Sequence, residues 1–192
     1  MKGKIFKNTV EISKFYMNKY VEPRDIVLDA TVGNGNDTLE LAKLVGNEGK
    51  VYGFDIQTEA INNTGKLLKE NNILGNIELI NDSHENIGDY IDQELDFIIY
   101  NLGYLPGGNK EIITEAETTV KSIKASLRLL KRNAILLVNS YVGHQGGAEE
   151  NKALEGLLKG LDQRKFNVIK NEFLNQKNNP PKLYIIEKLN TK

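Results

Sequence analysis

The fold is decided by the stretch VLDATVGNGNDT at residues 27–38, in which an apolar run ends in an acid and a glycine turn opens a helix. A second apolar run, KVYGFD at residues 50–55, follows after a helix-length segment and again ends in an acid. Strand, glycine loop, helix and a second strand with a terminal carboxylate form the unit that holds an adenine nucleoside in α/β domains. The glycines let the backbone approach a ligand closely, and Asp55 is placed to accept both ribose hydroxyls.

Apolar runs and helical patterns alternate along the chain, which predicts parallel strands joined by right-handed crossovers. We expect strands at about 26–31, 50–56, 77–82, 95–101, 134–141, 166–174 and 183–189, and helices at about 7–20, 37–45, 58–71, 112–131 and 148–162. The last two strands are too close for a crossover helix, so they should pair or run antiparallel.

This layout predicts the α/β class and a Rossmann-like class I methyltransferase fold. The expected sheet has seven mostly parallel strands, an antiparallel last strand and helices on both faces. Neither a linker nor a repeat interrupts the pattern, so residues 1–192 are expected to form one domain. The N-terminal helix, within residues 1–22, is placed to cover a substrate.

Composition limits the function classes that fit this chain. It has 192 residues, a net charge of −1 and no cysteine, which excludes a disulfide framework, a thiolate zinc site and a cysteine nucleophile. Its two histidines form no HxxxH motif or acidic cluster, so no metal site is predicted. The N-terminus lacks the apolar segment of a signal peptide, and no apolar run approaches the roughly 20 residues of a membrane span. We therefore expect a cytoplasmic protein with no membrane partner.

The net charge conceals an uneven distribution. Residues 1–24 carry six Lys or Arg and two Glu, and residues 164–192 carry seven Lys or Arg and two Glu. The middle, residues 25–163, carries twelve basic and twenty-two acidic residues. If both ends lie on one face, they could bind nucleic-acid phosphates, although scattered solvated lysines explain the charge equally well.

Ligands of an open parallel sheet bind beyond the carboxyl ends of its strands, so the residues there form the predicted cofactor site. These residues are Asp29, Thr31, Gly33, Asn34, Gly35, Asn36, Asp37, Thr38, Asp55, Ile56, Gln57, Asp82, Ser83, His84 and Asn101. Three of them have ordinary alternatives: Asp55 and Asp82 as helix or turn caps, and His84 as a loop histidine.

Two nucleoside cofactors compete for this site. The glycine loop has only the first two glycines of the dinucleotide motif, with Thr38 in the third place, and Asp37 would meet the pyrophosphate of NAD unfavourably. S-adenosylmethionine has no phosphate and carries a sulfonium and an ammonium, which nearby acids favour. The sequence thus favours S-adenosylmethionine, with its methionine end at residues 31–37, its ribose at Asp55 and its adenine near residues 82–84.

The segment NLGYLP at residues 101–106 predicts the acceptor site. Methylation of an amine needs a neutral nitrogen lone pair aimed along the methyl–sulfur bond, which a carboxamide and an adjacent ring achieve by orientation. Asn101 and Tyr104 are therefore predicted catalytic residues, and Tyr104 also contacts substrate; the alternative is a turn with a core tyrosine. His144, in YVGHQGG at residues 141–147, is predicted to remove a proton or contact substrate phosphate, with a turn histidine as the alternative.

A second substrate-binding element is predicted in NQKNNPP at residues 175–181. Amide side chains there could read a base edge, and a lysine could hold a phosphate. The residues concerned are Asn175, Lys177, Asn178 and Asn179. A plain polar loop is the alternative.

Taken together, the motifs resemble those of the small bacterial methyltransferases known as rRNA methylases. The resemblance extends from about residue 20 to residue 188 and rests on DATVGNGNDT at 29–38, GFDIQ at 53–57, NLGYLPGG at 101–108, GHQGG at 143–147 and NQKNNPP at 175–181. It implies S-adenosylmethionine as cofactor and, from Gram-positive members, the anticodon loop of tRNA as partner. The implied reaction methylates the amino group of 5-aminomethyl-2-thiouridine at the wobble position. Val32 departs from the cysteine expected in many relatives, and its similar size predicts little consequence.

Other functions stay open at this point. An rRNA or small-amine methyltransferase would differ in which substrate accepts the methyl group. A non-enzymatic module would use S-adenosylmethionine as a structural or sensing ligand, and the intact acceptor loop argues against it. The aromatic residues of the N-terminal helix fit either a homodimer interface or a helix that only covers the sheet.

Overall fold

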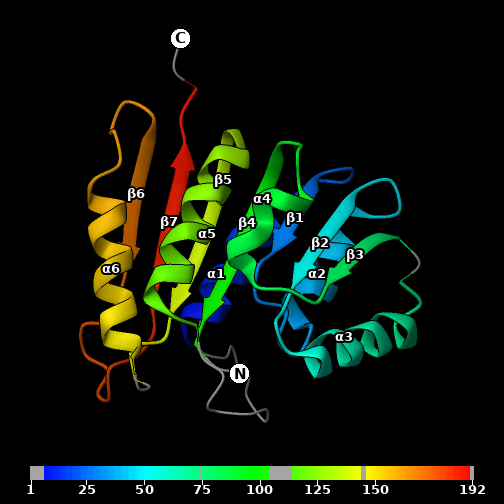
Figure 1. The fold of residues 1–192 in the computed structure, drawn as a ribbon, viewed down its shortest axis with the longest axis horizontal. Helices are drawn as coiled ribbons and strands as arrows, with labels where there is room; N and C mark the ends of the chain where they lie inside the picture. The colour runs from blue at the N-terminus through cyan, green and yellow to red at the C-terminus, as the bar shows by residue number, and fades with distance from the viewer. Residues whose placement is uncertain (1–6, 74, 104–113, 144–145, 191–192) are drawn as a thin grey trace, which may run out of the picture.

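The computed structural model describes residues 7–73, 75–103, 114–143 and 146–190 of the chain. Its centre is a seven-stranded sheet with the strand order β3-β2-β1-β4-β5-β7-β6 (Figure 1). The strands are β1 (Ile26–Asp29), β2 (Lys50–Phe54), β3 (Asn76–Ile80), β4 (Leu95–Leu102), β5 (Leu130–Ser140), β6 (Phe166–Asn171) and β7 (Lys182–Lys188). β1 to β5 pair in parallel, whereas β7 is antiparallel to both β5 and β6. The predicted α/β class, the seven strands and the antiparallel last strand are confirmed.

Helices cover both faces of this sheet, with α4, α5 and α6 in front of it and α1 and α2 behind it in Figure 1. Their bounds are α1 (Thr9–Tyr20), α2 (Asn36–Val45), α3 (Thr58–Glu70), α4 (Ile87–Tyr90), α5 (Ala116–Leu129) and α6 (Gly147–Lys159), with a 3-10 helix η1 (His84–Asn86). One core joins α1, α2 and α3 to the sheet through buried Met17, Leu41 and Leu68. The other joins α4, α5 and α6 through Ile87, Ile123 and Leu154, so the sheet is buried on both faces.

Strand register brings the loops of the predicted site to one edge of the sheet, called here the carboxyl edge because the parallel strands end there. The last residue of β1, Asp29, pairs with Gly53 near the end of β2 and with Ile99 in β4. Ser140, at the end of β5, pairs with Lys182, at the start of the reversed strand β7. The loop between β6 and β7 therefore emerges at the carboxyl edge, as predicted.

Two local expectations were wrong. The turn after β3 winds into η1 and α4, which are too short to show a helical period in the sequence. They begin where Ser83 caps the backbone N–H of Glu85 and Asp82 accepts from Asn86. The strand expected at 166–174 ends at Asn171, because β6 is an edge strand whose pairing with β7 runs only from Phe166 to Asn171.

The first helix shows two kinds of surface. Met17 is buried against the sheet, while Phe15 and Tyr20 are 66% and 50% exposed. α1 thus covers the sheet with one side and leaves aromatic rings on the other, and a homodimer through these rings stays a prediction. No helix in the described ranges is long and apolar enough to cross a membrane.

Candidate functional site

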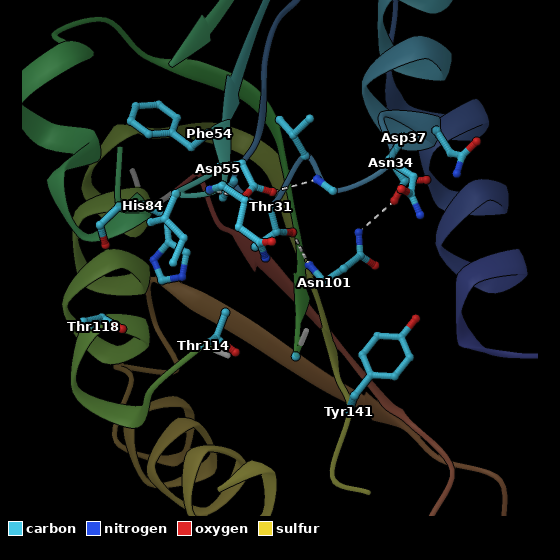
Figure 2. A pocket seen from close by; sticks show the side chains of 18 of the residues that line it. Thr31, Asn34, Asp37, Phe54, Asp55, His84, Asn101, Thr114, Thr118 and Tyr141 are labelled. Atoms are coloured by element: carbon cyan, nitrogen blue, oxygen red, sulfur yellow. Dashed lines mark hydrogen bonds between the residues drawn. The ribbon is translucent and has the colours of Figure 1, made fainter. Parts of the chain in front are cut away.

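A cavity of about 550 Å³ opens at the carboxyl edge of the sheet (Figure 2). Its volume lies in the range of small-molecule and cofactor sites, roughly 300–1,000 Å³. Its wall includes these predicted cofactor-binding residues: Thr31, Gly33, Asn34, Asn36, Asp37, Asp55, Ile56, Gln57, Ser83, His84 and Asn101. The remaining four, Asp29, Gly35, Thr38 and Asp82, lie outside the wall.

The glycine loop after β1 is tied to the end of β2 by one carboxylate. The backbone N–H of Gly33 donates to Asp55 Oδ2 at 2.8 Å, and that of Gln57 donates to Asp55 Oδ1 at 2.9 Å. Burial raises the pKa of Asp55, and these two hydrogen bonds oppose the rise. Gly35 is in the left-handed region with φ +77°, and a Cβ there would lie 2.5 Å from Thr64 Oγ1 of α3. Asp55 therefore ties the glycine loop to the end of β2, and position 35 has no room for a side chain.

Asp29 supports this loop from behind the cavity. It is fully buried, and its carboxylate accepts from the Thr31 backbone N–H at 3.2 Å and from Thr38 Oγ1 at 2.6 Å. Burial, aided by the Asp37 carboxylate, raises the pKa of Asp29 to about 7. Asp29 and Thr38 thus join the loop to the start of α2 rather than face a ligand.

A second link crosses from the glycine loop to β4. Asn101 Nδ2 donates to Asp37 Oδ2 at 2.9 Å, and the Asn101 backbone N–H donates to Thr31 Oγ1 at 2.6 Å. Burial raises the pKa of Asp37, which the hydrogen bond from Asn101 opposes. Figure 2 shows Asn101 between Asp37 and the Tyr141 ring. The carboxamide predicted for the acceptor and the acid predicted for the cofactor therefore touch.

Of the three residues predicted in the turn after β3, two line the cavity and one does not. His84 and Ser83 line the cavity, and His84 is buried, with no hydrogen-bond partner for Nδ1 among the residues that the structure describes. Burial lowers the pKa of His84 to about 4, so the ring is neutral near pH 7. Asp82 instead accepts from the Ser83 backbone N–H and from Tyr90 Oη, so it stabilises the turn as the cap alternative has it.

The predicted substrate residues fall into two groups. Tyr104 and His144 lie outside the described residues. Asn175, Lys177, Asn178 and Asn179 are exposed in the loop between β6 and β7. A Cβ on Gly143 would be 3.9 Å from the Asn179 carbonyl oxygen, so this loop borders the one after β5. Within the described ranges, no group of three or more His, Cys, Asp or Glu could hold a metal ion.

The two ends of the segment between β4 and α5 are anchored. The Thr114 backbone N–H donates to the Gly103 carbonyl at 3.0 Å. Buried Glu150, in the first turn of α6, accepts from Thr114 Oγ1 at 2.9 Å and from Thr119 Oγ1 at 2.6 Å. Gly103 and Thr114 both line the cavity, so this closure shapes its wall.

Comparison with known proteins decides the family. Residues 51–187, more than half of the chain, match the family model described as "Putative rRNA methylase". The chain belongs to this family. Its membership confirms the predicted enzyme class, a methyltransferase that depends on S-adenosylmethionine.

Three relatives are similar to this family member along nearly its whole length. The tRNA (mnm(5)s(2)U34)-methyltransferase, chloroplastic, of Arabidopsis thaliana is 35% identical over 196 residues, which cover 96% of this chain and 71% of the relative. A crystal structure described as a putative rRNA-methylase from Clostridium thermocellum is 44% identical with a TM-score of 0.93, covering 96% and 99% of the two chains. A putative methyltransferase from Streptococcus mutans in complex with SAH is 38% identical with a TM-score of 0.87, with the same coverage.

Sequence reasoning missed part of the cavity wall in this rRNA methylase family member. The wall residues that were not predicted are Val10, Val32, Phe54, Thr114, Glu115 and Thr118. Ala30, Gly103 and Tyr141 follow strands and were expected at the carboxyl edge, although without an assigned binding role. Val10 of α1 and Thr118 of α5 arrive from helices distant in sequence, and only tertiary packing brings them to the site.

Proposed function

We propose that this enzyme methylates RNA on nitrogen, and that its acceptor is the aminomethyl group of 5-aminomethyl-2-thiouridine at the wobble position of tRNA. The observation that carries the proposal is the contact between Asn101 and Asp37, which puts a neutral carboxamide beside the acidic glycine loop in one cavity wall. The 35% identity to an enzyme named for the wobble uridine supports this choice of substrate.

The residues of the cavity fit S-adenosylmethionine. The acids Asp37 and Asp55 favour the positive sulfonium and ammonium groups, and Asp55 has lone pairs left to accept from ribose hydroxyls. His84 Nδ1, which has no hydrogen-bond partner in the described ranges, offers a buried polar atom to the adenine. When bound, the cofactor supplies an electrophilic methyl group.

The chemistry left to the protein is orientation of the amine. Asn101 Oδ1 can accept a hydrogen bond from the substrate N–H and aim the nitrogen lone pair at the methyl group. His84 is a poor base for this amine, because burial lowers its pKa to about 4. We propose Tyr104 beside the transferring group and His144 on the substrate, as the sequence predicts.

Substrate RNA is proposed to lie across the carboxyl edge beside β7. The loop at residues 172–181 is exposed there and borders the loop after β5. Lys177 is proposed to bind a phosphate, while the amides of Asn175, Asn178 and Asn179 contact bases of the anticodon loop. Lys170, Lys177 and Lys182 lie toward the carboxyl edge, whereas Arg164, Lys165 and Lys188 lie at the other end of β6 and β7, so the proposed phosphate contact rests on this loop and not on the net charge of residues 164–192.

The test is methyl transfer to purified tRNA that lacks the terminal methyl, with isotope-labelled S-adenosylmethionine and mass spectrometry of the digested nucleosides. The expected product is 5-methylaminomethyl-2-thiouridine, which is heavier than its precursor by one labelled methylene unit. Fully methylated tRNA is the matched control and should accept no label. Asn101→Ala should retain cofactor binding, measured by calorimetry, and lose turnover.

The same assay distinguishes the alternative methyl acceptors. Label in undermethylated rRNA but not in tRNA would show that the substrate is rRNA, as the family description states, and would overturn the tRNA proposal. Label in neither RNA, with cofactor still bound, would overturn the RNA proposal and leave small amines. Full activity of Asn101→Ala would overturn the active-site assignment.

A further inference from the structure

A buried asparagine on β5 stands behind the acceptor amide. We propose that Asn139 is a positioning residue that fixes which end of the Asn101 carboxamide faces the substrate amine. The inference rests on the proposed function, in which Asn101 Oδ1 accepts from that amine. Nothing in the sequence singles out Asn139, which lies inside the apolar run of β5.

Four elements are joined by one chain of hydrogen bonds through this residue. Asn139 Nδ2 donates to Asn101 Oδ1 at 3.0 Å and to Ser13 Oγ of α1 at 2.9 Å. Asn101 Nδ2 in turn donates to Asp37 Oδ2 of α2 at 2.9 Å. The chain therefore runs from α1 through β5 and β4 to the glycine loop.

The direction of these bonds determines the orientation of Asn101. A carboxamide has one accepting and one donating end, and a half-turn exchanges them. Ionised Asp37 can only accept, and the amide nitrogen of Asn139 can only donate, so both neighbours select the same orientation. The reversed amide would set oxygen against oxygen at Asp37 and nitrogen against nitrogen at Asn139. Ser13 Oγ accepts from the same Asn139 nitrogen and holds the side chain in place, although a hydroxyl can pair with either end of an amide.

Asn139 acts only through Asn101. Its side chain is fully buried and is not part of the cavity wall, whereas Asn101 is. The carbonyl oxygen of Asn101 has two lone pairs, so it can accept from Asn139 and from a substrate N–H at once. Asn139 thus determines where the free lone pair of Asn101 points without touching the substrate.

The decisive variant is Asn139→Leu, which keeps the branched shape of the side chain, is somewhat larger, and removes the donor. We expect kcat for methyl transfer to fall roughly 10- to 100-fold, the scale of a misplaced reacting group. The Kd for S-adenosylmethionine and the KM for tRNA should stay within about threefold, because no cavity-wall residue is replaced. Ser13→Ala should lower kcat less, because Asn139 keeps its donor to Asn101.

Ser140→Ala is the matched control. Ser140 is the next residue on β5, is also buried, and its hydroxyl has no hydrogen-bond partner within the described part of the chain. This variant should keep the wild-type kcat, and thermal melts of all variants set an assay temperature at which each is folded. A structural role alone would lower the melting temperature of Asn139→Leu and leave kcat unchanged at that temperature.

A second readout needs no substrate. The side-chain amide resonance of Asn101 in a proton–nitrogen correlation spectrum should shift in Asn139→Leu and stay in place in Ser140→Ala. If the wild-type enzyme methylates no tRNA, the proposed function fails, and this spectrum still tests the positioning. An unshifted Asn101 resonance, or a folded Asn139→Leu enzyme with wild-type kcat, would overturn the inference.

Discussion

Two loops at the carboxyl edge of the sheet are held in opposite ways. The glycine loop after β1 is bound to the ends of β2 and β4 through Asp55 and Asn101, and its Gly35 packs on α3. The loop at residues 172–181 projects from the edge, with Leu174 94% exposed. The first loop is preorganised by bonds within the protein, and the second presents its polar groups outward.

This difference separates the common part of the reaction from its specific part. The cofactor is the same small molecule in every catalytic cycle, so a preorganised site favours its binding. RNA is a large ligand that is bound at the protein surface. Side chains that contact it must be exposed and able to form hydrogen bonds with it. The glycine loop should therefore tolerate few substitutions, and the exposed loop should tolerate many with effects limited to substrate binding.

Substitution of Asp55 should have the largest effect on the preorganised glycine loop. Asp55→Ala leaves the N–H groups of Gly33 and Gln57 without their acceptor and removes the proposed ribose contact. We expect cofactor affinity to fall by roughly 3 kcal/mol, or about 100-fold, by calorimetry. Asp82→Ala is the control, because Asp82 lies at the end of the neighbouring strand but outside the cavity wall. Equal losses in the two variants would contradict the assignment.

A methyl group on Gly35 tests the rigidity of the same loop. In Gly35→Ala the new Cβ would meet Thr64 Oγ1 at 2.5 Å in a left-handed backbone conformation. The free energy of unfolding should fall by about 2–3 kcal/mol, measured by urea denaturation. Gly88→Ala, where a Cβ has nothing within 4 Å, should change it by less than about 1 kcal/mol. A stable Gly35→Ala protein would show that the loop can relax.

The buried ring of His84 should make the free energy of unfolding depend on pH. Its pKa is about 4 in the folded protein and 6.5 when unperturbed, so between these values the unfolded chain binds the extra proton. Stability from this group therefore rises with pH over that interval and is lost on acidification. His84→Gln should flatten the rise, measured by urea unfolding between about pH 4.5 and pH 7.

Asp29 provides the opposite control for this titration. Its pKa is raised from 3.8 to about 7, so the folded protein holds the extra proton and this contribution to stability falls as pH rises. Asp29→Asn should therefore steepen the overall rise of stability with pH. An unchanged slope in His84→Gln would show that the ring is not buried in solution.

The smallest effect is expected in the exposed loop. Lys177→Ala should raise the KM for tRNA roughly two- to fivefold and reduce the salt dependence of binding by about one ion. Cofactor affinity and the melting temperature should not change. Lys69→Ala, at the exposed end of α3 away from the carboxyl edge, is the matched control. A loss of stability in Lys177→Ala would place this loop with the glycine loop as a structural element.

Sequence patterns predicted the fold well because apolar periodicity and glycine turns are local signals. The parallel pairing of β1 with β2 and the position of Asp55 beside Gly33 follow from the βαβ unit. Contacts between distant elements could not be predicted in this way. Val10 in the cavity wall and the bond from Asn139 to Ser13 depend on how α1 docks on the sheet, for which the sequence has no spacing rule.

The role of a carboxylate at a strand end was equally difficult to predict. Asp29, Asp55 and Asp82 follow three neighbouring strands and appear equivalent in the sequence. The structure gives only Asp55 access to the cavity, because Asp29 is enclosed beneath the glycine loop and Asp82 turns toward Tyr90.

The hydrogen bond between Gly103 and Thr114 has an evolutionary consequence. It links two residues of the cavity wall, and Glu150 holds Thr114 from α6. Because the bond fixes both ends of the intervening stretch, we expect changes in its length or sequence to leave the pairing of β4 and the start of α5 intact. Selection can then act on the stretch between Gly103 and Thr114 separately from the glycine loop.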